Sequence, residues 1–142
     1  MITYFETSAI VKLVVVEEET DRAAAIWDAS DLALTSRLAY IEARAALAAA
    51  RRARRISVAG LEGAKRALEE RFEELDVIEV APEIARSGGD LAEQHGLRGY
   101  DAIHLASALA VEADHLVLIT WDRDLARAGR TVGFDLAGIA AD

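Results

Sequence analysis

The sequence predicts a three-layer α/β/α domain in which a parallel β-sheet lies between two layers of helices. Apolar or β-branched runs of four or five residues, the length of a buried strand, recur along the chain. Longer stretches rich in Ala, Leu, Glu and Arg, which favour helix, separate these runs. Short buried strands that alternate with helices are typical of a parallel sheet covered on both faces.

Five short runs are the candidate strands. Four are clearly apolar, and a weaker one lies near the C-terminus; they cover residues 2–5, 32–35, 77–80, 116–120 and 131–134. The segments between them are the predicted helices, over residues 7–18, 20–30, 37–54, 61–75, 82–96, 100–113 and 123–128. In such a fold, ligands bind beyond the carboxyl ends of the strands, near the point where the strand order reverses.

Local signals support several of these helices. Leu61, Leu68 and Leu75 recur at helical spacing and share one face of the 61–75 segment. Pro82 suits the first position of a helix, where a backbone N–H is not needed. Gly96 suits the left-handed residue that often follows the end of a helix.

Length and composition indicate a single domain over residues 1–142. A chain of 142 residues has the size of one domain and can bury a core of its own. The sequence contains no cysteine, which excludes disulfide scaffolds, zinc ribbons and thiol nucleophiles and fits a reducing compartment. It also lacks a basic, apolar leader and any apolar run near the roughly 20 residues of a membrane span. We therefore expect a soluble, cytoplasmic protein with no membrane partner.

The net charge is acidic. The chain has 25 Asp and Glu against 16 Lys and Arg, a formal charge of −9. This balance argues against non-specific binding of duplex DNA, which depends on Lys and Arg that displace counterions from the phosphates. It is compatible with a nuclease in which an acidic cluster holds cations.

Four acidic residues stand in unusual positions. Glu6 directly follows one predicted strand, and Asp122 follows another after Trp121, so both would project from the same edge of the sheet. Glu42 and Asp101 lie in strongly apolar helical segments. No Lys or Arg recurs at helical spacing to neutralise Asp101, although Arg98 is close in the sequence.

Two interpretations of these acids are open. Taken singly, Asp101 fits a helix N-terminus, Glu6 and Asp122 fit helix caps, and Glu42 fits a solvated helix position. Taken together, carboxylates that converge need compensation, which a divalent cation supplies. Carboxylate oxygens without His or Cys suit a hard ion such as Mg²⁺ or Mn²⁺.

Four segments resemble the motifs of the PIN domain and occur in the order typical of that family. They span nearly the whole chain, at residues 4–13, 36–47, 97–106 and 119–125. The 97–106 segment, Leu-Arg-Gly-Tyr-Asp-Ala-Ile-His-Leu-Ala, is the most specific of them. Within that superfamily, a stand-alone domain of this length is similar to the VapC ribonuclease toxins of bacterial toxin–antitoxin pairs.

The resemblance implies a five-stranded parallel sheet and an endoribonuclease, a hydrolase that depends on Mg²⁺ or Mn²⁺ and cuts tRNA, rRNA or mRNA. The family's catalytic acids correspond to Glu6, Glu42, Asp101 and Asp122. Glu6, Asp101 and Asp122 would bind the metal, and Glu42 would orient a water molecule or accept a hydrogen bond behind the site. The residues expected to support the carboxylates are Ser8, Thr120 and Asp124.

The resemblance also implies an antitoxin protein as partner, and a homodimer. One departure from the family pattern concerns Glu6, because the first motif usually carries Asp. The additional methylene moves the carboxylate outward and can change metal coordination. A PIN-fold module that binds or regulates but has impaired catalysis is therefore the alternative to a working nuclease.

Two features outside the acidic set have open interpretations. The basic run Arg51, Arg52, Arg54 and Arg55 either complements a helix dipole or holds an RNA backbone. His104, one turn from Asp101, either forms hydrogen bonds near the site or is a half-buried helix residue. Other phosphate-handling folds do not fit, because Glu6-Thr7-Ser8 lacks the paired acids of those enzymes and no glycine-rich phosphate loop is present.

Overall fold

Residues 1–140, the part of the chain that the computed structural model describes, form seven helices and five strands, with one or two helices between successive strands. The strands are β1 (Ile2–Phe5), β2 (Leu32–Ser36), β3 (Asp76–Ile78), β4 (Leu116–Thr120) and β5 (Asp135–Gly138). The helices are α1 (Thr7–Val14), α2 (Thr20–Asp28), α3 (Arg37–Arg52), α4 (Val58–Glu74), α5 (Pro82–His95), α6 (Gly99–Leu109) and α7 (Arg123–Thr131).

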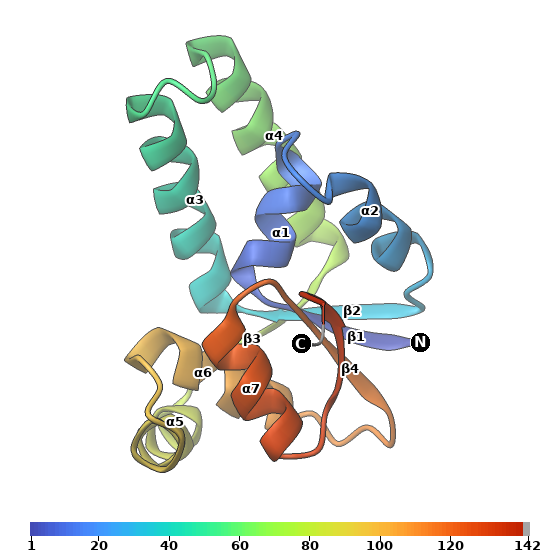
Figure 1. The fold of residues 1–142 in the computed structure, drawn as a ribbon, viewed down its shortest axis with the longest axis vertical. Coiled ribbons are helices and arrows are strands. Elements are labelled where there is room, and N and C mark those ends of the chain that lie inside the picture. The colour runs from blue at the N-terminus through green and yellow to red at the C-terminus, as the bar shows by residue number, and fades with distance from the viewer. Residues whose placement is uncertain (141–142) are drawn as a thin grey trace.

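The strands form one sheet in the order β3-β2-β1-β4-β5, and every neighbouring pair is parallel. Helices α1 to α4 cover one face of this sheet, and α5, α6 and α7 cover the other (Figure 1). Two apolar clusters fill the two interfaces. One contains Leu105 and Leu125 on the α6 and α7 side, and the other contains Leu47 and Leu68 on the α3 and α4 side. The predicted three-layer architecture with a parallel sheet is confirmed.

The strand prediction for residues 131–134 is wrong. Thr131 ends α7, its hydroxyl donates a hydrogen bond to the Arg127 carbonyl, and β5 begins only at Asp135. Gly133, at a φ of +97°, makes the turn between them. The β-branched residues Thr131 and Val132 suggested a strand, but α7 continues to Thr131, and Val132 caps its end by donating its backbone N–H to the Ala128 carbonyl. The true strand lies at a sheet edge and contains Asp135 and Gly138, so its sequence is less apolar than that of a buried strand.

Most helix boundaries agree with the sequence signals to within a few residues. Pro82 occupies the first turn of α5, and Gly96 follows its end with a φ of +63°, as predicted. The largest differences are at the ends of α1 and α6, which stop at Val14 and Leu109 before the predicted 18 and 113.

The central strand β1 defines the point where the strand order reverses. It pairs with β2 on one side and with β4 on the other, with Phe5 beside Ile119 in the β1–β4 ladder. The residues that follow these two strands therefore emerge next to each other at the carboxyl edge of the sheet. Glu6 follows β1, and Asp122 lies two residues beyond β4.

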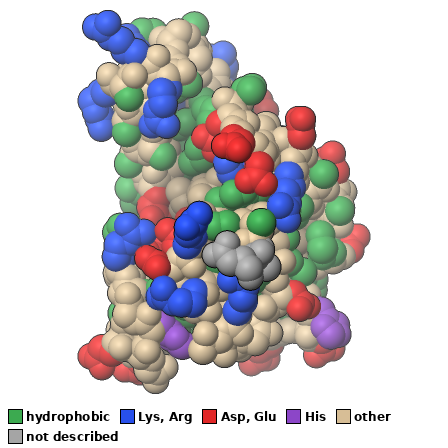
Figure 2. Space-filling view, in the orientation of Figure 1, with side chains coloured by type: hydrophobic (Ala, Val, Ile, Leu, Met, Phe, Trp, Pro, Cys, Tyr) green, Lys and Arg blue, Asp and Glu red, His purple; other side chains and the backbone are tan. Residues whose placement is uncertain are grey.

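The α3–α4 pair extends furthest from the sheet. In Figure 1, the end of α3 and the beginning of α4 project beyond the other elements. In the space-filling view, this end of the molecule carries Lys and Arg side chains (Figure 2). Among residues 1–140, no helix is both long and apolar enough to cross a membrane.

Candidate active site

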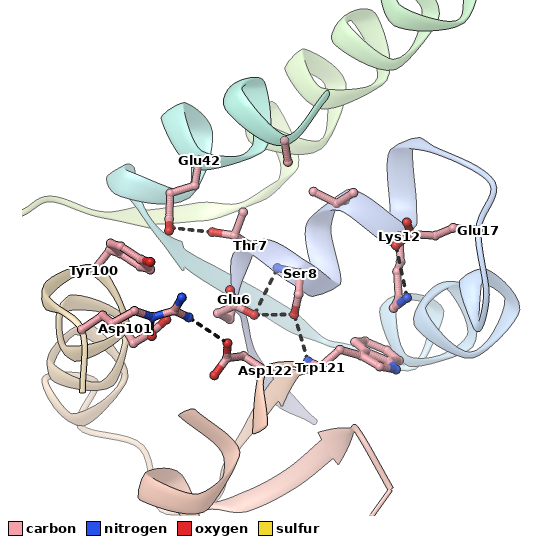
Figure 3. Close-up of a pocket in the computed structure, with 13 residues that line it drawn as sticks. Glu6, Thr7, Ser8, Lys12, Glu17, Glu42, Tyr100, Asp101, Trp121 and Asp122 are labelled. Carbon is pink, nitrogen blue, oxygen red and sulfur yellow. Dashed lines mark hydrogen bonds and ion pairs between the residues drawn. The ribbon is translucent and has the colours of Figure 1, made fainter. Parts of the chain in front are cut away.

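A cavity of about 350 Å³ opens at the carboxyl edge of the sheet. All four acids singled out from the sequence line it, and each comes from a different part of the fold. Glu6 leads into α1, Glu42 lies on α3, Asp101 opens α6 and Asp122 precedes α7 (Figure 3). The structure therefore brings the two strand-end acids and the two helix acids together around one pocket.

Glu6 is held by three donors. Its Oε2 accepts hydrogen bonds from the backbone N–H of Ser8 at 3.1 Å, from the Ser8 hydroxyl, and from the Thr120 hydroxyl at 2.8 Å. The bond from the Ser8 N–H is a helix cap on α1, so Glu6 caps a helix and also faces the cavity. Burial raises the pKa of Glu6 above its ordinary value, although these hydrogen bonds act in the opposite direction.

Thr120 joins two of the acids. Its hydroxyl donates to Glu6 and accepts the backbone N–H of Asp122 at 3.0 Å. The Ser8 hydroxyl similarly accepts the backbone N–H of Trp121 at 2.9 Å. Ser8 and Thr120 therefore bind the Glu6 carboxylate on one side and the backbone of Trp121 and Asp122 on the other.

Arg98 connects Asp101 to Asp122. Its Nε donates to Asp101 Oδ2 at 3.0 Å, and its terminal nitrogen donates to Asp122 Oδ2 at 3.2 Å. Asp122 also caps α7, with its Oδ1 accepting the Leu125 N–H at 2.8 Å. The expectation that Asp101 lacks a basic partner at helical spacing is wrong, because Arg98 lies three residues earlier at the start of α6 and reaches it.

Asp101 is 3% exposed, and this burial raises its pKa despite the hydrogen bond from Arg98. The Asp122 charge acts in the same direction as burial. The pocket thus contains two carboxyls, Glu6 and Asp101, whose charged forms are disfavoured in the metal-free protein. A bound cation would relieve that penalty.

The pKa of Glu42 is shifted in the opposite direction to those of Glu6 and Asp101. Burial acts to raise its pKa, but the hydrogen bonds and charge of its neighbours outweigh burial and lower it. Its Oε1 accepts the Thr7 hydroxyl at 2.7 Å and lies 2.6 Å from His104 Nε2. The Glu42 side chain is therefore a stably charged carboxylate at the rim of the pocket.

The comparisons with known proteins agree with this geometry. A family model described as PIN domain matches residues 3–131. The chain belongs to the PIN domain family. Ribonuclease VapC45 and Ribonuclease VapC49, from two strains of Mycobacterium tuberculosis, are each 43% identical to it over 141 residues, which is 99% of this chain and 98% of theirs.

Solved structures show the same fold at lower identity. Mycobacterium tuberculosis VapC20, described as a sarcin-ricin loop cleaving toxin, superposes with a TM-score of 0.69 at 17% identity, covering 89% of this chain and 95% of its own. A toxin–antitoxin complex from Klebsiella pneumoniae superposes with a TM-score of 0.63 at 21% identity, covering 87% and 90%. At these identities the likeness establishes the PIN fold alone.

The donor set of this PIN domain suits a hard divalent cation, since Glu6, Asp101 and Asp122 offer only carboxylate oxygens. Within residues 1–140, however, no three His, Asp or Glu side chains already stand in a metal-binding arrangement. The Arg98 guanidinium instead donates to one oxygen of Asp101 and one oxygen of Asp122. The residues therefore fit the ion by chemistry, with Arg98 as the counter-charge in the metal-free protein.

Other candidate residues lie outside the pocket. Asp124 is on the exposed side of α7, pairs with Arg127 at 3.0 Å and lines a different cavity. The basic run lies at the far end of α3 and the start of the following loop, and comprises Arg51, Arg52, Arg54 and Arg55.

Sequence analysis missed Arg98 and Thr7 as functional residues. Arg98 could have been found from its i, i+3 spacing to Asp101 at the helix start. No local signal identifies Thr7, because its partner Glu42 is 35 residues away.

Proposed function

We propose that this PIN domain is an endoribonuclease of the VapC type, the toxin of a toxin–antitoxin pair, which hydrolyses RNA phosphodiester bonds with Mg²⁺ or Mn²⁺. One observation carries the proposal: Glu6, Asp101 and Asp122 meet in one pocket at the reversal point of a PIN-fold sheet. The ribonuclease names of relatives that are 43% identical over almost the whole chain support the reaction class.

Each residue has a distinct role in this proposal. A divalent ion, when bound, supplies charge neutralisation for the phosphate and activates hydrolysis. Glu6, fixed by Ser8 and Thr120, and the carboxylates of Asp101 and Asp122 would hold the ion. Glu42, whose Oε1 is engaged by Thr7 and His104, would present its other oxygen to a water molecule in the pocket. Arg98, which is largely exposed, would contact a phosphate oxygen of the RNA.

The proposed partners follow from the same relatives. Structural neighbours include toxin–antitoxin complexes, which supports a cognate antitoxin as the binding partner. We also propose a homodimer, as the family resemblance implies. The cytoplasm is the expected location, because the tRNA, rRNA or mRNA substrate is found there.

Cleavage of a mixed tRNA and rRNA pool tests the proposal directly. Purified wild type is incubated with Mg²⁺, Mn²⁺ or EDTA beside Asp101→Asn and the matched control Asp90→Asn, which changes an exposed acid on α5. We expect discrete, metal-dependent cuts by the wild type and the control, and none by Asp101→Asn.

Equal cutting by the wild type and Asp101→Asn would reveal a contaminating nuclease and contradict the proposal. A wild type that folds but cuts nothing would favour the binding or regulatory module, for which Glu6 is the supporting observation. Glu6→Asp, tested under the same conditions, then separates these alternatives, since recovered cleavage would show that Glu6 has impaired the site.

The basic run at the end of α3 gives a second test. Replacing Arg51, Arg52, Arg54 and Arg55 by Ala in the Asp101→Asn background allows RNA binding to be measured without cleavage. If these arginines hold the RNA backbone, affinity falls and the slope of log K against log salt decreases by about 0.7 for each lost phosphate contact. Unchanged binding would assign the run to the helix dipole alone.

A further inference from the structure

His104 lies at the centre of a buried hydrogen-bond chain behind the pocket. Its ring is fully buried on α6, 5.9 Å from the ring of Tyr4 in an edge-to-face contact. The Tyr4 hydroxyl lies 2.8 Å from His104 Nδ1, and His104 Nε2 lies 2.6 Å from Glu42 Oε1. The chain therefore links the central strand β1 to α6 and then to α3, across the carboxyl edge of the sheet.

The direction of these hydrogen bonds follows from the chemistry of the groups. The buried Tyr4 hydroxyl lies within hydrogen-bond distance of Nδ1, and a tyrosine hydroxyl, with an ordinary pKa of about 10, keeps its hydrogen at neutral pH and can donate it to Nδ1. A neutral imidazole that accepts at Nδ1 carries its hydrogen on Nε2. That hydrogen points at Glu42 Oε1. An ionised carboxylate oxygen has no hydrogen of its own, so it can only accept this hydrogen bond.

Glu42 needs such support because its own helix does not provide it. The Glu42 side chain is 22% exposed and is long enough to adopt several rotamers on the surface of α3. Two donors from different elements, the Thr7 hydroxyl and His104 Nε2, converge on the same oxygen and select one rotamer. The second carboxylate oxygen is thereby turned to a fixed place in the pocket.

We propose that Tyr4 and His104 are positioning residues: Tyr4 selects the ring tautomer of His104, and His104 in turn fixes the Glu42 carboxylate. The sequence left a half-buried helix histidine as one interpretation of His104, and its complete burial between two polar partners supports the other. The consequence for RNA cleavage rests on the proposed function, whereas the tautomer and the Glu42 contact do not.

Nitrogen-15 NMR of the His104 ring, in the protein prepared without metal, tests the tautomer. We expect the wild type to show the Nε2–H form. Tyr4→Phe removes the donor to Nδ1, and we expect a mixture of tautomers together with a changed carboxyl carbon shift of Glu42. The matched control is Tyr40→Phe, which removes a hydroxyl bonded to Glu69 on the outer surface of α3 and α4. It should leave both signals unchanged.

Substitutions at His104 separate positioning from packing. His104→Gln retains an N–H donor near the place of Nε2, whereas His104→Phe fills the volume of the ring and donates nothing. We expect His104→Phe to lower kcat for RNA cleavage by about ten-fold with little change in KM, and His104→Gln to recover part of the loss. A packing role alone would make kcat follow the melting temperature of the variants instead.

The readouts distinguish failure of this inference from failure of the proposed function. The positioning chain would be overturned if the wild-type ring carried its hydrogen on Nδ1. It would also be overturned if the NMR signals of His104 and Glu42 were the same in Tyr4→Phe as in the wild type, whatever the protein cleaves. Full kcat in a folded His104→Phe would overturn it as well. If the wild type cleaves no RNA, the NMR shifts in Tyr4→Phe and Tyr40→Phe still decide whether the chain exists.

Discussion

Gly138 at the end of β5 controls the position of Thr120, and Gly138→Ala should therefore damage both stability and the acidic pocket. Gly138 has a φ of +111° and pairs with Thr120 in the β4–β5 ladder. A Cβ at this position would lie 2.2 Å from the Thr120 carbonyl oxygen and 2.9 Å from its carbonyl carbon. Both are backbone atoms, so no rotamer change can relieve the contact.

The expected loss has three parts. An L-residue at such a φ costs about 1–2 kcal/mol, and forcing backbone apart at a filled site costs about 1–3 kcal/mol more. The adjacent hydrogen bond from Ile139 N–H to the Thr120 carbonyl, 2.9 Å long, contributes about 1 kcal/mol and is weakened by the same shift. The total of about 4 kcal/mol corresponds to a melting temperature lower by about 12 °C, at about 3 °C per kcal/mol.

Gly133→Ala is the matched control for the part of the stability loss that comes from the positive φ. Gly133 also has a positive φ, +97°, but a Cβ there meets no atom within 4 Å. Only the φ penalty applies, which predicts a fall of about 3–6 °C. Thermal unfolding of the wild type and both variants, with EDTA and with Mn²⁺, measures the difference.

The same experiment reports on the pocket. Thr120 holds Glu6 and the backbone of Asp122, so its displacement by Gly138→Ala should also reduce the stabilisation that Mn²⁺ confers. Equal losses of stability in Gly138→Ala and Gly133→Ala would refute the argument from the backbone clash. An unchanged Mn²⁺ effect in Gly138→Ala would refute the link to the carboxylates.

Three further variants address the site and the core. Because burial raises the pKa of Glu6, its contribution to stability is full below its ordinary pKa of 4.5 and is lost as the pH rises through the raised value. Glu6→Gln should accordingly melt higher than the wild type at pH 7 in EDTA and lose that advantage near pH 4; a lower melting temperature at pH 7 would contradict this. Arg98→Ala removes the guanidinium that pairs with Asp101 and Asp122, so it should tighten Mn²⁺ binding several-fold, as measured by calorimetry. Weaker Mn²⁺ binding would instead indicate that Arg98 helps to hold the two carboxylates in place. Leu68→Ala empties a fully buried site and should lower the free energy of unfolding by about 2–5 kcal/mol in urea, whereas a loss below 1 kcal/mol would indicate that the core collapses around it.

The sequence alone determined the layers of the fold and the acids of the pocket. Strands β1 and β4 are recognisable because both faces are buried, so their residues are almost all apolar and the acids that follow them stand out. Glu42 and Asp101 stand out for the same reason, as charges in apolar helical segments. The position of the edge strand β5 was predicted wrongly, because a strand that is paired on one side only can have a less apolar sequence.

Only the tertiary structure decided how these acids are held. Thr120 donates to Glu6 across 114 positions of sequence, and Tyr4 meets His104 across 100. Asp124, close to Asp122 in sequence, was directed away from the pocket by the start of α7. Burial leaves a periodic mark in the local sequence, because it acts on each segment separately. A hydrogen bond between distant segments leaves none, because it depends on the packing of the whole chain.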